Sequence, residues 1–212
     1  MKSQIHAVSP IIVVATRNTG KLREFQTLLR PFDYDIRGLA DFTDDTGNVE
    51  IEESGSTFAE NARLKAVGYS MLVPCPVIAD DSGLEVAALG GRPGIHSARY
   101  AGPDASDADR INKLLGELES CGGGRDARFV CALALARNGE VVAQAEESCY
   151  GLIISEARGT KGFGYDPVFL FPELGKTFAE LDESEKNRLS HRAHAVAALQ
   201  TLIQSIIPTN NN

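Results

Sequence analysis

The 212-residue chain is short of positive charge. Lys and Arg total 21 against 29 Asp and Glu, so the formal net charge is −8 at pH 7. Polymeric nucleic acid and anionic membrane surfaces are bound by basic faces, and we therefore expect neither as a partner. The deficit of positive charge does not exclude a small phosphorylated ligand, because a few lysines and a metal ion can form a local positive pocket.

Long hydrophobic runs are also missing, since no segment approaches the ~18 apolar residues of a membrane span. The stretch from Val8 to Ala15 is interrupted by Pro10 and has neither a charged n-region nor a cleavage site, so we expect no signal peptide. The four cysteines show no CxxC spacing, which indicates reduced thiols, and Cys131 lies in the apolar run FVCALALA of a predicted core. These features predict a cytoplasmic protein.

The sequence contains no internal repeat and no low-complexity tract. Its length suits one large domain or two closely joined lobes. We expect a flexible extension at 1–9, a folded unit at 10–207, and a flexible tail at 208–212, whose Asn run has nothing to pack against.

Apolar periodicity predicts strands that alternate with helices. One strong hairpin signal, Asn138-Gly139, interrupts this alternation. The predicted strands are 11–15, 77–79, 128–136, 140–154 and 167–171, and the predicted helices are 22–31, 58–72, one capped by Ser106 or Asp107, and one from Ser190 to the C-terminus. The pattern predicts an α/β protein with a mixed sheet.

The first strand runs into a polar loop that ends in Gly-Lys. A P-loop needs G-x-x-x-x-G-K-[ST], but Ala15 occupies the first Gly position and Leu22 follows the lysine. What remains is a set of hydroxyl, amide and ammonium donors at a helix N-terminus, which favours anions. The alternative is an ordinary strand-to-helix turn with a surface lysine. The candidate phosphate-binding residues are Thr16, Arg17, Asn18, Thr19, Gly20 and Lys21.

A second polar stretch places Glu52 and Glu53 just before a predicted helix. On that helix, Asn61 and Lys65 are four residues apart and therefore project from one face. A solvated loop ahead of a surface helix would give the same pattern.

Two adjacent carboxylates, Asp80 and Asp81, follow an apolar strand, although burying unpaired charge is costly. In an extended strand they point to opposite faces, so one is expected to act directly and the other to support it. Oxygen ligands of this kind suit Mg²⁺, which binds one or two carboxylates together with substrate phosphates. The alternative is an Asx turn closed by Ser82 and Gly83.

The fourth stretch is GFGYDP, from Gly162 to Pro167, followed downstream by SHR. Phe163 between glycines can present its ring to a planar base, and such stacking contributes roughly 1–3 kcal/mol per base. Arg192 can donate to a ring oxygen while Asp166 holds neighbouring donors. A strand-entry turn and a helix cap would explain the two motifs separately, and without an HExxH pattern we do not expect a histidine metal site.

Taken together, these stretches resemble the inosine/xanthosine triphosphate pyrophosphatase family, over nearly the whole chain from Ile12 to about Leu202. The matching motifs occur in order: TxNxGK from Thr16, ExGxTFxENAxxKA from Glu53, ADDSGL from Ala79, PGIxSARY from Pro93, GFGYDP from Gly162 and EKxxxSHR from Glu185.

The resemblance implies that residues 10–207 form a single two-lobed catalytic domain. Its lobes would surround an elongated mixed sheet flanked by helices, with an active-site cleft between them, and the protein would be a homodimer. It implies Mg²⁺-dependent hydrolysis of purine nucleoside triphosphates such as ITP, dITP and XTP. Glu53 and Asp81 would bind Mg²⁺, with Asp81 as general base. Besides the first loop, the substrate-binding residues would be Lys65, Ser82, Phe163, Gly164, Tyr165, Asp166, Lys186, His191 and Arg192.

Two other functions are considered. A related nucleotide pyrophosphatase would act on modified pyrimidine triphosphates, and the FGYDP and SHR motifs argue against it. A nucleotide-binding module without turnover would be expected to lack Glu53 or Asp81, and both are present. The chain departs from the family pattern at Arg17, where many relatives carry Gly, and at His96, a position that is often aromatic.

Overall fold

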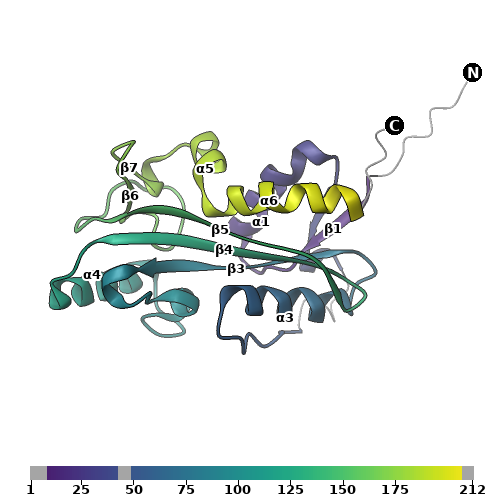
Figure 1. Ribbon diagram of the computed structural model, residues 1–212, viewed down its shortest axis with the longest axis horizontal. Helices are drawn as coiled ribbons and strands as arrows, with labels where there is room; N and C mark the ends of the chain where they lie inside the picture. Colours follow the sequence, from purple (N-terminus) through teal and green to yellow (C-terminus); the bar gives the residue numbers. More distant parts are fainter. Residues whose placement is uncertain (1–8, 43–48, 207–212) are drawn as a thin grey trace, which may run out of the picture.

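Seven strands form one mixed sheet in the order β2-β1-β3-β4-β5-β6-β7 (Figure 1). The computed structural model describes residues 9–42 and 49–206. The first three strands in this order are parallel, and every later pairing is antiparallel. The strands are β1 Ile11–Val14, β2 Asp35–Gly38, β3 Val77–Val86, β4 Asp126–Arg137, β5 Glu140–Ile153, β6 Phe169–Phe171 and β7 Lys176–Thr177.

Helices cover both faces of this sheet. Figure 1 shows α3 below the long strands and α1 and α6 above them, with α4 below the far end of β3 and β4. The helices are α1 Thr19–Leu29, α3 Phe58–Ser70, α4 Asp107–Cys121, α5 Glu183–Leu189 and α6 His191–Ile206. The predicted α/β fold with an elongated mixed sheet is confirmed.

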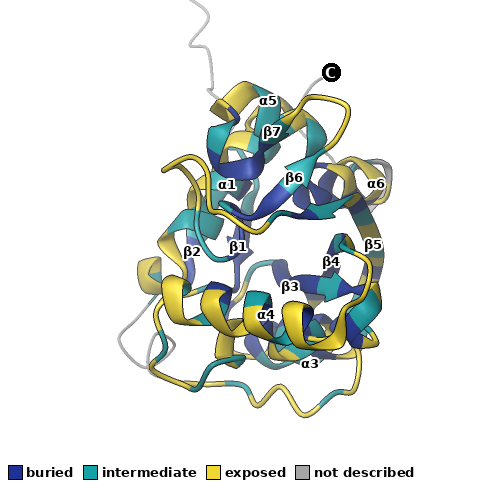
Figure 2. Ribbon diagram, turned by 90° about the vertical axis from the view of Figure 1, so that its left-hand side faces the viewer, coloured by how far each residue is buried: buried dark blue, intermediate teal, exposed yellow. Residues whose placement is uncertain are grey.

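Strand β4 shows why the sheet is buried on both sides. Cys131, Leu133 and Leu135 pack in a core with α1 and α6, whereas Ala132 and Ala134 between them pack in a core with α3. This period of two places successive side chains on opposite faces. The predicted core position of Cys131 is confirmed, and all four cysteines are free. In Figure 2 the central strands β3 and β4 are largely dark blue and the outer face of α4 is yellow.

The local signals for turns and helix starts agree with the structure. Asn138 and Gly139 have φ values of 51° and 82°, as a two-residue hairpin turn requires. The Ser106 side chain accepts the Asp109 N–H at the start of α4, and Ser190 Oγ accepts the Ala193 N–H at the start of α6.

Several elements differ from the prediction. Strand β3 continues through the two aspartates to Val86, so the alternative of an Asx turn at Asp80 is wrong. Helix α1 begins at Thr19, one turn earlier than predicted, because the Asn18 side chain accepts the Lys21 N–H. The short elements β2, β7 and α5 were not predicted, since none is long enough to show a clear hydrophobic period.

The sheet opens where β1 ends. Strand β1 pairs with β3 only at Val77 and Ile78, with a last bond from the Ala15 N–H to the Ile78 carbonyl. Between Ile78 and Glu85, which forms an isolated bridge with Pro93, β3 pairs with no other strand on that side among the described residues, and its polar stretch Asp80–Ser82 lies along this open edge.

The expected flexible ends, 1–9 and 208–212, lie outside the described residues apart from Ser9. Within the described ranges, no helix has the length and apolar character needed to cross a membrane.

Candidate active site

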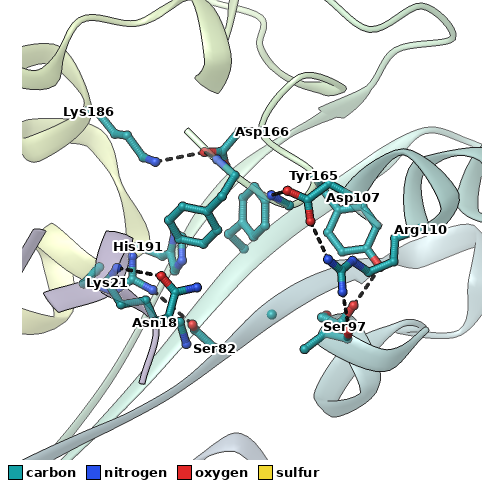
Figure 3. A pocket seen from close by; sticks show the side chains of 16 residues that line it. Asn18, Lys21, Ser82, Ser97, Asp107, Arg110, Tyr165, Asp166, Lys186 and His191 are labelled. Carbon is teal, nitrogen blue, oxygen red and sulfur yellow. Dashed lines mark hydrogen bonds and ion pairs between the residues drawn. The ribbon is translucent and has the colours of Figure 1, made fainter. Parts of the chain in front are cut away.

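A cavity of about 280 Å³ opens beside the free edge of β3 (Figure 3). One wall comes from the segment 163–166 and the starts of α5 and α6, and the other from Ser97 and the first turns of α4. Residues from five of the six sequence motifs meet there. The predicted site residues that line the cavity are Asn18, Lys21, Ser82, Phe163, Gly164, Tyr165, Asp166, Lys186, His191 and Arg192.

The first loop is shaped by its own side chains. Thr16 Oγ1 accepts the Asn18 N–H at 3.2 Å, and Asn18 Oδ1 accepts the Lys21 N–H at 3.0 Å. Thr19 and Gly20 form the first turn of α1, and a Cβ on Gly20 would lie 3.4 Å from the Phe163 ring. The loop and the Phe163 segment, far apart in sequence, therefore lie side by side.

Arg17 behaves differently from its neighbours in the loop. Its guanidinium donates to the Val49 carbonyl at 3.0 Å and lies 3.9 Å from the Glu50 carboxylate. Arg17 is exposed and does not line the cavity. His96, the second departure from the family pattern, is exposed and contacts Arg99 at 3.2 Å, also outside the cavity wall.

Asp80 lies on the side of the sheet that α1 and α6 cover, and its carboxylate pairs with two basic side chains. Lys21 Nζ donates to its Oδ1, and the Arg192 guanidinium donates to its Oδ2 from 3.3 and 3.4 Å. Burial opposes ionisation, but Lys21 and Arg192 outweigh it and hold the pKa of Asp80 far below its ordinary value. Asp80 is thus an ionised carboxylate that fixes two cavity cations.

Asp81 lies on the opposite face, toward α3. Asn61 Nδ2 donates to Asp81 Oδ2 at 3.1 Å, and Lys65 Nζ is 4.0 Å from Oδ1. Lys65 Nζ also donates to the Asp80 carbonyl at 2.7 Å and pairs with Glu53 at 3.2 Å. Burial, reinforced by the charge of Glu53 and opposed by Lys65, raises the pKa of Asp81 to about 6.

The carboxylates of Glu53 and Asp81 thus flank one lysine. Among residues 9–42 and 49–206, no group of three or more His, Cys, Asp or Glu side chains could hold a metal ion. Two carboxylates that leave most coordination positions to other oxygens match the way Mg²⁺ is held beside substrate phosphates. The donor set therefore fits Mg²⁺.

At the other end of the cavity, Glu24 and Asp166 hold Lys186. Lys186 Nζ lies 2.9 Å from carboxylate oxygens of both residues, and Glu24 also pairs with Arg192. Burial opposes the ionised form of Glu24, but Arg192 and Lys186 outweigh it and lower its pKa. Asp166 Oδ2 also accepts the Phe163 N–H at 3.0 Å. Lys186 Nζ lies 5.0 Å from the Phe163 ring centroid, within cation–π range.

His191 is buried behind this wall. Its ring stacks on Phe129 with centroids 4.9 Å apart and an interplanar angle of 14°. Burial and the nearby charge of Arg192 lower the pKa of His191 well below its ordinary value of 6.5, so the ring is neutral.

The ADDSGL and PGIHSARY motifs meet beside the cavity at Gly83. A Cβ there would lie 2.4 Å from Ser97 Oγ and 2.6 Å from the Gly94 carbonyl, so only glycine fits. Ser97 Oγ accepts the Leu84 N–H at 2.9 Å, and the Ser97 carbonyl accepts the Tyr165 hydroxyl at 3.0 Å. This contact therefore fixes the position of one motif against the other.

Four polar or charged side chains of the site were not predicted: Glu24, Ser97, Asp107 and Arg110. Glu24 follows Lys21 by three residues on α1, so helical spacing could have identified it. Asp107 was considered only as a helix cap, and its contact with Gly164 depends on tertiary structure.

The open edge of the mixed sheet brings together an anion-binding helix start, a carboxylate pair and an aromatic-lined cavity. This combination is typical of an α/β protein that binds nucleotides. The chain belongs to the Ham1 family, whose model matches residues 12–202. The predicted family resemblance is confirmed.

Relatives of known name cover almost the whole chain. A dITP/XTP pyrophosphatase of Geobacillus kaustophilus is 53% identical over 197 residues, covering 92% of this chain and 95% of the relative. A dITP/XTP pyrophosphatase of Bacillus subtilis is 47% identical over 196 residues, covering 91% of this chain and 96% of the relative.

Solved structures agree with the fold. A HAM1 protein from Coxiella burnetii superposes with a TM-score of 0.83 at 42% identity, covering 92% of this chain and 99% of that one. The Staphylococcus aureus Ham1 protein gives a TM-score of 0.80 at 40% identity, with the same coverage of both chains.

Proposed function

We propose that this chain hydrolyses deaminated purine nucleoside triphosphates, namely ITP, dITP and XTP, to the monophosphate and pyrophosphate, and so removes them from the nucleotide pool. The observation that carries the proposal is a single cavity that joins the donors of the first loop to Phe163 and the SHR motif. Relatives that match over most of their length are named dITP/XTP pyrophosphatases. This is a hydrolase acting on a phosphoric anhydride bond.

The triphosphate binds at the start of α1. Thr16, Asn18, Thr19, Gly20 and Lys21 offer hydroxyl, amide and ammonium donors at the positive end of an 11-residue helix. Lys65 adds a second cation from the α3 side of the sheet, and Arg17 adds a charge at the outer side of the loop. Phosphoryl transfer requires mainly positioning and charge neutralisation, which these groups supply.

The base binds against Phe163, with Gly164, Tyr165 and Asp166 shaping the same wall. Lys186 and Arg192 are the donors for the keto oxygen at position 6, and neutral His191 lies behind them. Adenine carries an amino group at that position and would leave buried donors unpaired. A site built on such hydrogen bonds discriminates by ~10⁴-fold or more.

Glu53 and Asp81 are the residues that would hold Mg²⁺, which when bound supplies positive charge for the developing pyrophosphate. Asp81 orients the attacking water and accepts its proton, and Asn61 and Lys65 hold the Asp81 carboxylate for this role. Ser82, whose Oγ accepts from Arg192 at 3.2 Å, contacts the substrate beside it.

We further propose that residues 10–207 act as one catalytic domain, in a homodimer, in the cytoplasm, on free nucleotides rather than on polymeric nucleic acid. The alternatives, a pyrimidine-specific enzyme and a module without turnover, are disfavoured by the family match over residues 12–202 and by the presence of both Glu53 and Asp81.

The test is a panel of nucleoside triphosphates, with and without Mg²⁺, in which pyrophosphate and orthophosphate are scored separately. We expect pyrophosphate from ITP, dITP and XTP, and at least ~10²-fold slower turnover of ATP. Chelation of the metal should abolish turnover without unfolding the protein, because Lys65 pairs with both carboxylates in its absence. Orthophosphate as the product, or equal rates on ATP and ITP, would contradict the proposal.

A further inference from the structure

The Phe163 segment is tied to the rest of the protein through two successive backbone N–H groups, and each donates to a carboxylate. The Phe163 N–H bonds Asp166, three residues further along the same loop. The Gly164 N–H donates to Asp107 Oδ2 at 2.7 Å. Asp107 lies in the first turn of α4, 57 residues away, so this bond joins opposite walls of the cavity.

Arg110 aims the Asp107 carboxylate. Its Nη2 lies 2.5 Å from Asp107 Oδ1, which leaves Oδ2 for the Gly164 N–H. Arg110 Nη1 donates to the Ala98 carbonyl, so the guanidinium is fixed from two sides (Figure 3). Arg110 Nε is buried and has no hydrogen-bond partner among the described residues, which shows that the guanidinium is placed by its other contacts.

The loop needs such an external tie because its own backbone is permissive. Gly162 and Gly164 flank Phe163 with φ values of 78° and 63°, a region that glycine adopts readily among many others. Ordering the loop when substrate arrives would cost conformational entropy, and a loop already held in place avoids that cost.

From this geometry we infer that Asp107 is a positioning residue that latches the segment 162–166 to α4 and so holds the Phe163 ring ready for the base. Arg110 orients the latch. Because Asp107 and Arg110 together carry no net charge, the latch does not repel the triphosphate. The inference rests on the proposed function only in assigning Phe163 to the base.

A matched control variant tests whether Asp107 acts only by stabilising the start of α4. Acidic residues in the first turn stabilise a helix start, and α4 has two, Asp107 and Asp109. Asp109 accepts the Ser106 N–H and hydroxyl and does not line the cavity. Asp109→Ala therefore weakens the same helix start and leaves the latch intact.

The experiment compares the full-length wild type with Asp107→Ala, Asp107→Asn and Asp109→Ala. Each protein is assayed for kcat and KM with ITP and for the Ki of inorganic tripolyphosphate, which has the phosphates without a base. We expect Asp107→Ala to raise KM for ITP about tenfold, as loss of a charge-assisted bond would. The change in kcat should stay below about threefold and the Ki should not change. Asp107→Asn should recover part of the loss, since its amide oxygen still accepts.

Hydrogen exchange at the Gly164 amide, followed by NMR, tests the latch without turnover. It should be faster in Asp107→Ala and unchanged in Asp109→Ala. The latch is overturned if Gly164 exchange is unaltered in Asp107→Ala, if KM and Ki rise together, or if Asp109→Ala reproduces the effect. A wild type that releases no pyrophosphate from ITP would refute the proposed function instead, while the exchange measurement would still decide on the latch.

Discussion

Arg192 Nη2 lies 3.3 Å from Asp80 Oδ2, and both side chains are only 1% exposed. Glu24 pairs with the same guanidinium from the other side, and Lys21 shares Asp80. The pair therefore links the start of α1 to the start of α6 in the interior, where an uncompensated charge is costly.

The first prediction is that Asp80→Asn destabilises the fold. The substitution leaves the buried Arg192 with one of its two carboxylates, Glu24, and removes the carboxylate that pairs with the half-buried Lys21. Breaking a buried pair in this way costs about 3–5 kcal/mol of the free energy of unfolding, measured by urea denaturation. Asp35→Asn is the control, because Asp35 and Arg37 form a pair whose side chains are about 40% exposed. It should cost about 1 kcal/mol or less, and equal losses would refute the role of burial.

The second prediction is that Asp81→Asn, unlike Asp80→Asn, lowers activity without destabilising the fold. Burial and the charge of Glu53 raise the pKa of Asp81 to about 6, so the ionised carboxylate at neutral pH is a burden on the folded state. Removing it should leave the melting temperature unchanged or higher. As the proposed base, Asp81 should contribute about 10²–10⁴-fold to kcat, while nucleotide binding is retained. Full activity in Asp81→Asn would contradict its role.

The third prediction concerns acid stability and His191. Its pKa in the folded state is held well below 6.5 by burial and by Arg192, so in acid only the unfolded chain takes up this proton. The stabilisation is therefore complete above about pH 6.5 and is lost as the pH falls below that value. We compare the free energy of unfolding of the wild type and of His191→Gln between about pH 8 and about pH 5.5. Their difference should fall by up to about 1.4 kcal/mol per pH unit, and a constant difference would show that His191 titrates normally.

Local patterns in the sequence were sufficient for most of the fold. The β4–β5 hairpin was predicted because Asn138-Gly139 encodes its turn, and α4 because Ser106 precedes an apolar stripe. The opposite orientations of Asp80 and Asp81 also followed from strand geometry alone. Each of these features depends on residues within a few positions of one another.

The cation partners of the site could not be predicted in this way. Sequence spacing does not reveal that Glu24 pairs with both Lys186 and Arg192, or that Asp107 reaches Gly164, because these contacts join elements from different parts of the chain. For the same reason Arg192 was expected only as a base-reading donor, whereas it also forms the centre of a buried ion-pair network.

The last prediction separates two glycines of the base loop. Gly162 and Gly164 both have positive φ, so alanine at either position costs about 1–2 kcal/mol of backbone strain. Only at Gly162 would the new Cβ meet another group, lying 2.0 Å from Asp166 Oδ2, whereas nothing lies within 4 Å at Gly164.

Gly162→Ala must therefore displace the carboxylate that holds the Phe163 N–H and Lys186. We expect kcat/KM for ITP to fall about a hundredfold in Gly162→Ala, as for a binding group moved by about 1 Å, and by no more than about threefold in Gly164→Ala. The Ki of tripolyphosphate should be the same in both variants, since the first loop is not disturbed. If the two variants lose activity equally, backbone strain rather than the Asp166 carboxylate controls the loop, and the assignment of Asp166 to base positioning is wrong.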